Sequence, residues 1–266
     1  MVDFTEKQFE RYNRHIIIKD FGAEGQAKIM NGKVLIIGAG GLGSPAALYL
    51  TAAGVGTIGI ADSDTVELSN LQRQIIHFTD DLGTPKATSA ATKMKALNPE
   101  VTVKTYHVFV KADNIQGIIQ DYDFVIDCTD NFAAKFLVND ACMMEGIPFS
   151  HGGVLQFNGQ TMTIMPEKSA CLRCVFEKPP PRGAVPNSTQ VGILGSVAGL
   201  LGTVQASEAL KFLTGAGELL TDSMFFFDIL TMEFIKFKLE KNSECGLCGE
   251  APTIRELIDE KQPDCD

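Results

Sequence analysis

Two Cys-x-x-Cys pairs stand out among the seven cysteines of this 266-residue chain. They are Cys171 with Cys174 and Cys245 with Cys248, and they lie far apart in the sequence. A redox motif needs only one such pair, whereas four thiolates suit a tetrahedral Zn²⁺. In a reducing compartment, two pairs therefore favour zinc. Because four protein ligands leave no open position on the metal, we expect a structural zinc that joins two distant segments.

A glycine-rich turn follows the apolar run Lys33–Ile37 and contains Gly38, Gly40, Gly41 and Gly43. Glycines keep such a turn tight and let backbone N–H groups approach a phosphate at the start of the next helix. By itself this pattern is typical of a dinucleotide site, and an NAD(P)-dependent oxidoreductase is one interpretation.

Polar residues beyond the turn favour a different chemistry. Asp62 ends the next apolar run, where a carboxylate accepts hydrogen bonds from ribose hydroxyls. The further candidates for this site are Asp64, Asn70, Arg73, Gln74, Lys86 and Asp130. Cations neutralise charge that builds on an α-phosphate, and a carboxylate such as that of Asp130 can hold Mg²⁺. The set therefore suits ATP, and it contains nothing that resembles an acid or base for hydride transfer.

Strands and helices must alternate to position these residues. Strands are predicted at Lys33–Ile37, Thr57–Ala61, Val101–Val108 and Phe124–Cys128, and helices at Ser44–Ala53, Lys86–Leu97 and Asn114–Ile119. This order predicts a Rossmann-like α/β fold, with a mostly parallel sheet and helices on both faces. The candidates then lie at the carboxyl ends of strands, where open α/β sheets bind ligands.

The second half of the chain predicts a mixed or antiparallel extension of the sheet. Strands are expected at Ile147–Gln156, Gln160–Pro166 and Met224–Leu230, and a long buried helix at Ser196–Thr214. We predict one domain over residues 1–266, with N-terminal helices at 1–30, a nucleotide-binding half at 31–150, a zinc-bearing half at 151–250 and a tail at 251–266.

Charge and hydropathy exclude some classes of function. The net charge of −10 argues against nucleic-acid binding, which needs clustered Lys and Arg. The charged N-terminus is unlike a signal peptide. The longest near-apolar stretch, Val191–Val204, is too short and too rich in Gly, Ser and Thr to span a membrane. We therefore expect a cytoplasmic protein without a membrane or nucleic-acid partner.

Five motifs in order resemble those of the MoeB/ThiF/HesA family, whose members are similar to ubiquitin-activating enzymes. They are RYNRHI at Arg11–Ile16, GAGGLGS at Gly38–Ser44, DxDxVxxSNLxRQ at Asp62–Gln74, GxPK at Gly83–Lys86 and DCTDN at Asp127–Asn131. The resemblance extends over nearly the whole chain. It implies an adenylyltransferase that binds Mg-ATP and the Gly-Gly tail of a small β-grasp sulfur-carrier protein.

The resemblance also implies roles for particular residues. Gly41 contacts phosphate, Asp62 holds the ribose, and Asp130 coordinates Mg²⁺. Phosphates are gripped by Asn70, Arg73 and Lys86. Arg14 reaches across a two-fold interface into the partner's site, which makes the enzyme a homodimer. The carrier binds to the zinc-bearing half, and its product feeds molybdopterin, thiamine or related sulfur-containing products.

The chain departs from part of the family in the segment before Val191-Gly192. Many members carry a cysteine there that links to the activated carrier, and Ser188 takes that place. A serine hydroxyl is a weaker nucleophile than a thiolate and cannot form a disulfide or persulfide. We therefore predict adenylation without a covalent enzyme adduct and a separate sulfur donor.

Three alternatives to carrier adenylation stay open from the sequence. One is the oxidoreductase, and another is a family member that adenylates tRNA or a peptide. The acidic charge counts against tRNA. The third is a non-catalytic binding module stabilised by zinc.

Overall fold

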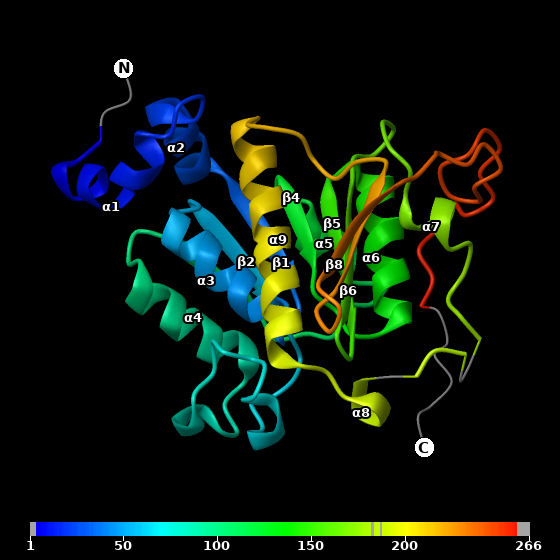
Figure 1. Ribbon diagram of the computed structural model, residues 1–266, viewed down its shortest axis with the longest axis horizontal. Coiled ribbons are helices and arrows are strands. Elements are labelled where there is room, and N and C mark those ends of the chain that lie inside the picture. Colours follow the sequence, from blue (N-terminus) through cyan, green and yellow to red (C-terminus); the bar gives the residue numbers. More distant parts are fainter. Residues whose placement is uncertain (1–3, 182–183, 187, 260–266) are drawn as a thin grey trace.

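The computed structural model describes residues 4–181, 184–186 and 188–259. Within these residues one sheet contains eight strands in the order β3-β2-β1-β4-β5-β6-β7-β8 (Figure 1). The strands are β1 (Lys33–Ile37), β2 (Thr57–Ala61), β3 (Thr102–Tyr106), β4 (Phe124–Asp127), β5 (Phe149–Leu155), β6 (Asn158–Ile164), β7 (Ser223–Asp228) and β8 (Glu233–Lys238).

The half formed by β3, β2, β1, β4 and β5 is parallel throughout. Parallel strands need crossover connections, which are usually helices. Here they include α3 (Gly43–Ala53), α4 (Lys86–Leu97), α5 (Ile115–Ile119) and α6 (Phe132–Glu145). The predicted mostly parallel sheet is confirmed.

Helices cover both faces of the parallel half. Successive side chains of a strand point to opposite faces. Val34 and Ile36 of β1 lie in one core with residues of α3, α4 and the long helix α9 (Gly195–Thr214). Leu35 and Ile37 lie in a second core with residues of α5 and α6. Burial on both sides explains why this strand is a continuous apolar run.

The other half of the sheet is antiparallel from β5 to β8, which confirms the predicted extension. Strand β8 was not predicted from the sequence. All six of its side chains are exposed, and it forms the edge of the sheet. Because β8 has no buried face, its apolar and polar residues do not alternate clearly, and that alternation is the pattern that predicts a strand.

Two helices at the N-terminus lie at the end of α3 that is remote from the glycine turn. They are α1 (Glu6–Ile16) and α2 (Gly22–Asn31). Asn98 donates from Nδ2 to the buried hydroxyl of Tyr12 at 2.8 Å. A Cβ on Gly54, which ends α3, would lie only 2.3 Å from that hydroxyl. The contact between Tyr12 and Gly54 therefore places α1 beside the last turn of α3.

The remaining short elements are η1 (Leu68–Asn70), η2 (Thr79–Asp81), α7 (Leu172–Val175) and α8 (Ser188–Val191). Among the residues that the structure describes, no helix combines the length and apolar character that a membrane crossing needs.

Candidate nucleotide site and metal centre

The glycine turn between β1 and α3 is too tight for other residues at two positions. Gly38 has φ +103°, and a Cβ there would lie 2.6 Å from the carbonyl oxygen of Cys128. A Cβ on Gly43 would lie 1.9 Å from the carbonyl oxygen of Gly38. The first turn of α3 has no side-chain cap. The N–H of Ser44 donates to the carbonyl of Gly40 and Pro45 has no N–H, so the N–H of Gly43 is the group in this turn that can face an anion.

Asp62 fixes this turn to the end of β2. Its Oδ2 accepts a hydrogen bond from the N–H of Ala39 at 2.7 Å, and its Oδ1 accepts one from the N–H of Asp64 at 2.8 Å. Burial raises the pKa of Asp62, and the two N–H donors oppose that rise. Each carboxylate oxygen has a further lone pair, so both can still accept a hydrogen bond from a ligand hydroxyl.

Lys86 is brought to the same edge by Asp64. The Nζ of Lys86 lies 2.8 Å from Oδ2 of Asp64, and its main-chain N–H donates to the carbonyl of Asp64. The Lys86 side chain is 7% exposed and that of Asp64 is 65% exposed. The cation is therefore held near the protein surface by a partner that solvent and ligands can reach.

Arg73 and Gln74 pack against the glycines. A Cβ on Gly41 would lie 3.5 Å from Cγ of Arg73, and one on Gly40 would lie 3.6 Å from Nε2 of Gln74. Arg73 also donates from Nη1 to the carbonyl of Ser69 at 3.1 Å. Within the described part of the chain, the buried Oε1 of Gln74 has no hydrogen-bond partner. An unpaired buried acceptor beside a glycine cradle fits a bound polar ligand.

Asn70 and the start of α9 complete this side of the site. The carbonyl of Asn70 accepts from the N–H groups of Arg73 and Gln74, which fixes the turn that carries both side chains. Gly195 approaches so closely that a Cβ would lie 2.3 Å from the carbonyl of Gln72. A helix from the second half of the chain therefore supports the predicted phosphate-binding turn.

Asp130 lies in the loop that follows β4, and it is exposed. The same loop begins at Cys128, whose carbonyl faces Gly38 of the glycine turn. The structure thus brings the loop of Asp130 to the same edge of the sheet as the glycines.

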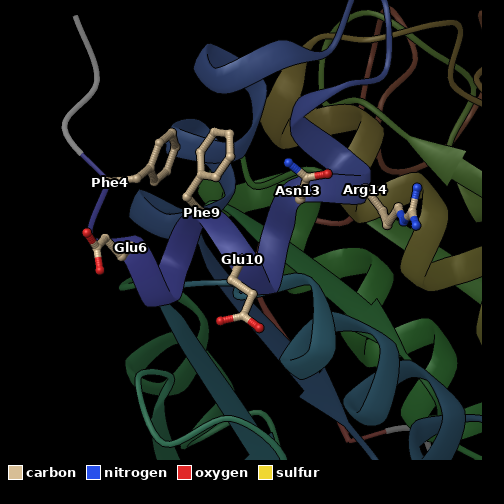
Figure 2. Close-up of a pocket in the computed structure, with 6 residues that line it drawn as sticks. All are labelled: Phe4, Glu6, Phe9, Glu10, Asn13 and Arg14. Atoms are coloured by element: carbon tan, nitrogen blue, oxygen red, sulfur yellow. The ribbon is translucent and has the colours of Figure 1, made fainter.

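Among the residues predicted for the nucleotide site, Arg14 is the one that the fold keeps apart from the others. It is exposed on α1, which lies beside the far end of α3. An eleven-residue helix such as α3 is about 16 Å long, so Arg14 cannot serve the glycine turn of its own chain. Figure 2 shows Arg14 at one end of a cavity that is also lined by Phe4, Glu6, Phe9, Glu10 and Asn13.

His77 has a structural role beside the glycine turn. It is buried, and its ring nitrogens lie 2.9 Å from the carbonyl oxygen of Ala39 and 2.8 Å from Oγ of Ser89. Burial lowers the pKa of His77, so the ring is neutral near pH 7. The histidine joins the glycine turn to α4.

A buried ionic cluster beneath the loop of Asp130 was not predicted from the sequence. It consists of Asp127, Lys135 and His151. The available signal was a lysine in the otherwise apolar stretch of α6 around Phe136 and Leu137. A buried charge at such a position implies a partner.

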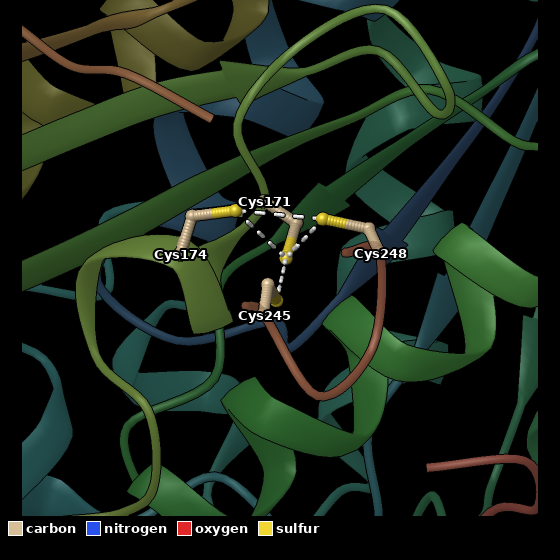
Figure 3. Close-up of side chains that lie close together, drawn as sticks. All are labelled: Cys171, Cys174, Cys245 and Cys248. Carbon is tan, nitrogen blue, oxygen red and sulfur yellow. Dashed lines mark hydrogen bonds between the residues drawn. The ribbon is translucent and has the colours of Figure 1, made fainter. Parts of the chain in front are cut away.

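The Sγ atoms of the four cysteines that were predicted to bind zinc lie close together (Figure 3). The Sγ atom of Cys171 lies 3.9 Å from that of Cys174, 3.7 Å from that of Cys245 and 3.5 Å from that of Cys248. Zn–S bonds of 2.3 Å in a tetrahedron put sulfurs about 3.8 Å apart. The spacing and the donor type therefore fit Zn²⁺.

The fold thus defines an α/β protein with a candidate nucleotide site at the carboxyl edge of a Rossmann-like sheet. The model of the ThiF family matches residues 12–247. The chain belongs to the ThiF family.

Named relatives and solved structures agree with that family. The SAMP-activating enzyme E1 of Haloferax volcanii is 44% identical over 243 residues, which cover 91% of this chain and 90% of that protein. The sulfur carrier protein adenylyltransferase of Thermus thermophilus is 42% identical over 261 residues, with 96% of each chain covered. The crystal structure of E. coli MccB with MccA-N7isoASN has a TM-score of 0.80 at 20% identity and covers 93% of this chain and 76% of MccB. That structure shares the fold.

Proposed function

We propose that this adenylyltransferase transfers AMP from ATP to the C-terminal glycine carboxylate of a small β-grasp sulfur carrier. The observation that carries the proposal is the convergence of the glycine turn with Arg73, Gln74 and Lys86 in a chain of the ThiF family. The Thermus thermophilus relative, which is named for this activity, aligns over 96% of this chain. Membership of the family favours adenylyl transfer over the oxidoreductase and binding-module alternatives.

The proposed reaction needs positioning and charge stabilisation rather than a general base. The carrier carboxylate is already ionised at neutral pH. One of its oxygens forms a bond to the α-phosphorus, the bond from that phosphorus to the bridging oxygen breaks, and pyrophosphate leaves. In this proposal Asn70, Arg73 and Lys86 stabilise the phosphate charge, and Asp62 holds the ribose. Asp130 would hold Mg²⁺, which supplies further neutralisation of phosphate charge.

The position of Arg14 supports a homodimer in which each chain completes the other's site. Arg14 is remote from its own glycine turn. Exposed apolar side chains lie near both segments: Ile17 and Ile18 follow α1, and Leu68, Ile75 and Phe78 surround the turn that carries Arg73. Two such apolar surfaces can be buried against each other about a two-fold axis.

Mixing two inactive variants tests this dimer. In a heterodimer of Arg14→Ala and Arg73→Ala, one site keeps both arginines and the other loses both. Equal amounts with free subunit exchange give half heterodimers, so about a quarter of wild-type activity should return. Each variant measured alone is the control. No recovery after verified subunit exchange would show that Arg14 does not act across the interface.

Edge strand β8 supports carrier docking on the half formed by residues 151–250. Phe234, Ile235 and Phe237 are exposed there, together with Leu230 and Met232 in the preceding turn. An unpaired edge with apolar side chains is suited to a partner that brings its own sheet. The molybdopterin and thiamine pathways both use such carriers, and the pathway is assigned by which carrier reacts.

Carrier-dependent ATP–pyrophosphate exchange tests the proposed function directly. We expect exchange with Mg²⁺ and one Gly-Gly-ended carrier of the MoaD or ThiS type, and none without a carrier. The same carrier without its last glycine is the matched control. Exchange that does not depend on any carrier would contradict the proposal, as would turnover with a tRNA or a free peptide alone.

No covalent adduct between carrier and enzyme should form at the position of Ser188. The side chain of Ser188 lies outside the described residues, so this prediction rests on the chemistry of the hydroxyl. The measurement is denaturing mass spectrometry of enzyme, carrier and ATP. A Ser188→Cys variant serves as the positive comparison, and a wild-type adduct at this residue would overturn the prediction and the inferred separate sulfur donor.

A further inference from the structure

Three ionisable side chains meet beneath the loop that carries Asp130. Asp127 is the last residue of β4 and is fully buried. Lys135 is on the first turn of α6, and His151 is on β5. The side chains of Lys135 and His151 are 9% and 4% exposed. The proposed reaction uses none of them directly.

Two of the three groups that Lys135 contacts are main-chain carbonyls. Its Nζ donates to the carbonyl of Thr129 at 2.7 Å and to that of Gly152, and it lies 3.4 Å from Oδ2 of Asp127. The ammonium therefore ties the loop after β4 to the neighbouring strand β5. A buried ammonium has three donors to satisfy, and here one of them goes to the residue immediately before Asp130.

Asp127 also binds Thr129, through the N–H and the hydroxyl of that residue. Its Oδ1 accepts from the N–H of Thr129 at 3.0 Å and from Oγ1 of Thr129 at 2.6 Å. Its Oδ2 lies 3.0 Å from Nδ1 of His151. Thr129 is thus fixed through its N–H, its hydroxyl and its carbonyl, immediately before Asp130.

The residue after Asp130 is fixed as well. Asn131 caps α6 by accepting at Oδ1 from the N–H of Ala134 at 2.8 Å. Asp130 therefore has a restrained neighbour on each side while its own side chain is exposed. Such an arrangement limits where the carboxylate can lie without burying it.

The charges of the cluster balance. Burial opposes ionisation of Asp127, but the Lys135 charge and the hydrogen bonds from His151 and Thr129 hold its pKa at about 2. Burial lowers the pKa of His151, so the ring is neutral and its Nδ1–H can donate to Asp127. One cation and one anion remain, and neither can be removed alone without leaving an uncompensated buried charge.

We infer that Lys135 is a positioning residue that sets the location of the Asp130 carboxylate for Mg²⁺. This inference rests on the proposed function, which assigns Mg²⁺ to Asp130. Loss of a residue that hydrogen-bonds to a metal ligand or positions it typically lowers metal affinity about 10- to 100-fold. The half-saturating Mg²⁺ concentration is therefore the informative quantity, since a defect in folding alone lowers the amount of active enzyme without shifting it.

The experiment titrates Mg²⁺ in the carrier-dependent pyrophosphate exchange of four variants. Lys135→Met removes the cation at nearly constant length. Asp127→Asn combined with Lys135→Met removes both charges and keeps an acceptor for Thr129, so the variant avoids an unpaired buried anion. Asp130→Asn reports on the proposed ligand. Lys93→Met removes a cation paired with Asp81 on another helix and is the matched control.

We expect the half-saturating Mg²⁺ concentration to rise about 10- to 100-fold in Lys135→Met and in the double variant. Lys93→Met should keep the wild-type value, and the double variant should recover thermal stability relative to Lys135→Met.

A double variant with wild-type Mg²⁺ dependence would overturn the inference and leave the pair a structural one. If Asp130→Asn itself has wild-type Mg²⁺ dependence, the assignment of Asp130 in the proposed function fails and the inference fails with it. If the half-saturating Mg²⁺ concentration rises in Asp130→Asn but not in Lys135→Met, the inference about Lys135 fails and the proposed function stands.

Discussion

Arg73→Ala should lower the rate of carrier-dependent pyrophosphate exchange by about 10²- to 10³-fold, which corresponds to about 2.7–4 kcal/mol of transition-state stabilisation. The guanidinium stem lies against Gly41 of the glycine turn, where the proposed α-phosphate would sit. A positive charge at that place stabilises the transition state most, because negative charge builds up on the phosphate during the transfer. The measurement is kcat for exchange at saturating ATP, Mg²⁺ and carrier.

The fold should tolerate this substitution. Within the described residues, the Arg73 side chain donates one hydrogen bond, to the carbonyl of Ser69 near the surface, and such bonds contribute little to stability. Gln72→Ala is the matched control, because its side chain is the exposed neighbour of Arg73. An Arg73→Ala enzyme within threefold of wild type would mean that the proposed phosphate site is wrong.

Cys248→Ser should abolish stoichiometric zinc binding and lower Tm by on the order of 10 °C. Structural zinc contributes about 10–16 kcal/mol of apparent binding free energy in zinc-finger peptides, and part of such a term is lost from the stability of the fold. The four cysteines join the segment after β6 to the segment after β8. The measurements are zinc content by elemental analysis and Tm by calorimetry.

The chain provides an internal comparison for the zinc prediction. Arg73→Ala should keep full zinc content, because Arg73 and the cysteines lie on separate elements. A chelator should lower the Tm of the wild type and leave that of Cys248→Ser unchanged. If Cys248→Ser keeps both zinc and Tm, the four sulfurs are not a structural metal site.

The sheet of the nucleotide-binding half could be predicted because its local signals agree. Lys33–Ile37 is an apolar run that precedes glycines, and it becomes β1 with both faces buried. The antiparallel edge gave weaker signals. Strand β8 has no buried face, so the alternation that identifies a strand is missing from Glu233–Lys238.

Some parts of the candidate site could likewise be predicted from the sequence, and others could not. Glycine spacing and the Cys-x-x-Cys pairs were visible because close approach and metal ligation demand particular residue types at fixed intervals. The cluster of Asp127, Lys135 and His151 was not visible. Its members come from β4, α6 and β5, and no fixed spacing relates them.

The sequence by itself therefore determined the alternation of strands and helices, the glycine turn and the identity of the four clustered cysteines, because each depends on short-range patterns of residue type. Only the tertiary structure decided that α9 supports the turn of Arg73, that Arg14 lies at the far end of α3, and that Lys135 contacts the carbonyl before Asp130. These relations depend on how helices and strands distant in sequence pack against one sheet. Packing is set by complementary shape and burial across the whole core, which no single segment encodes.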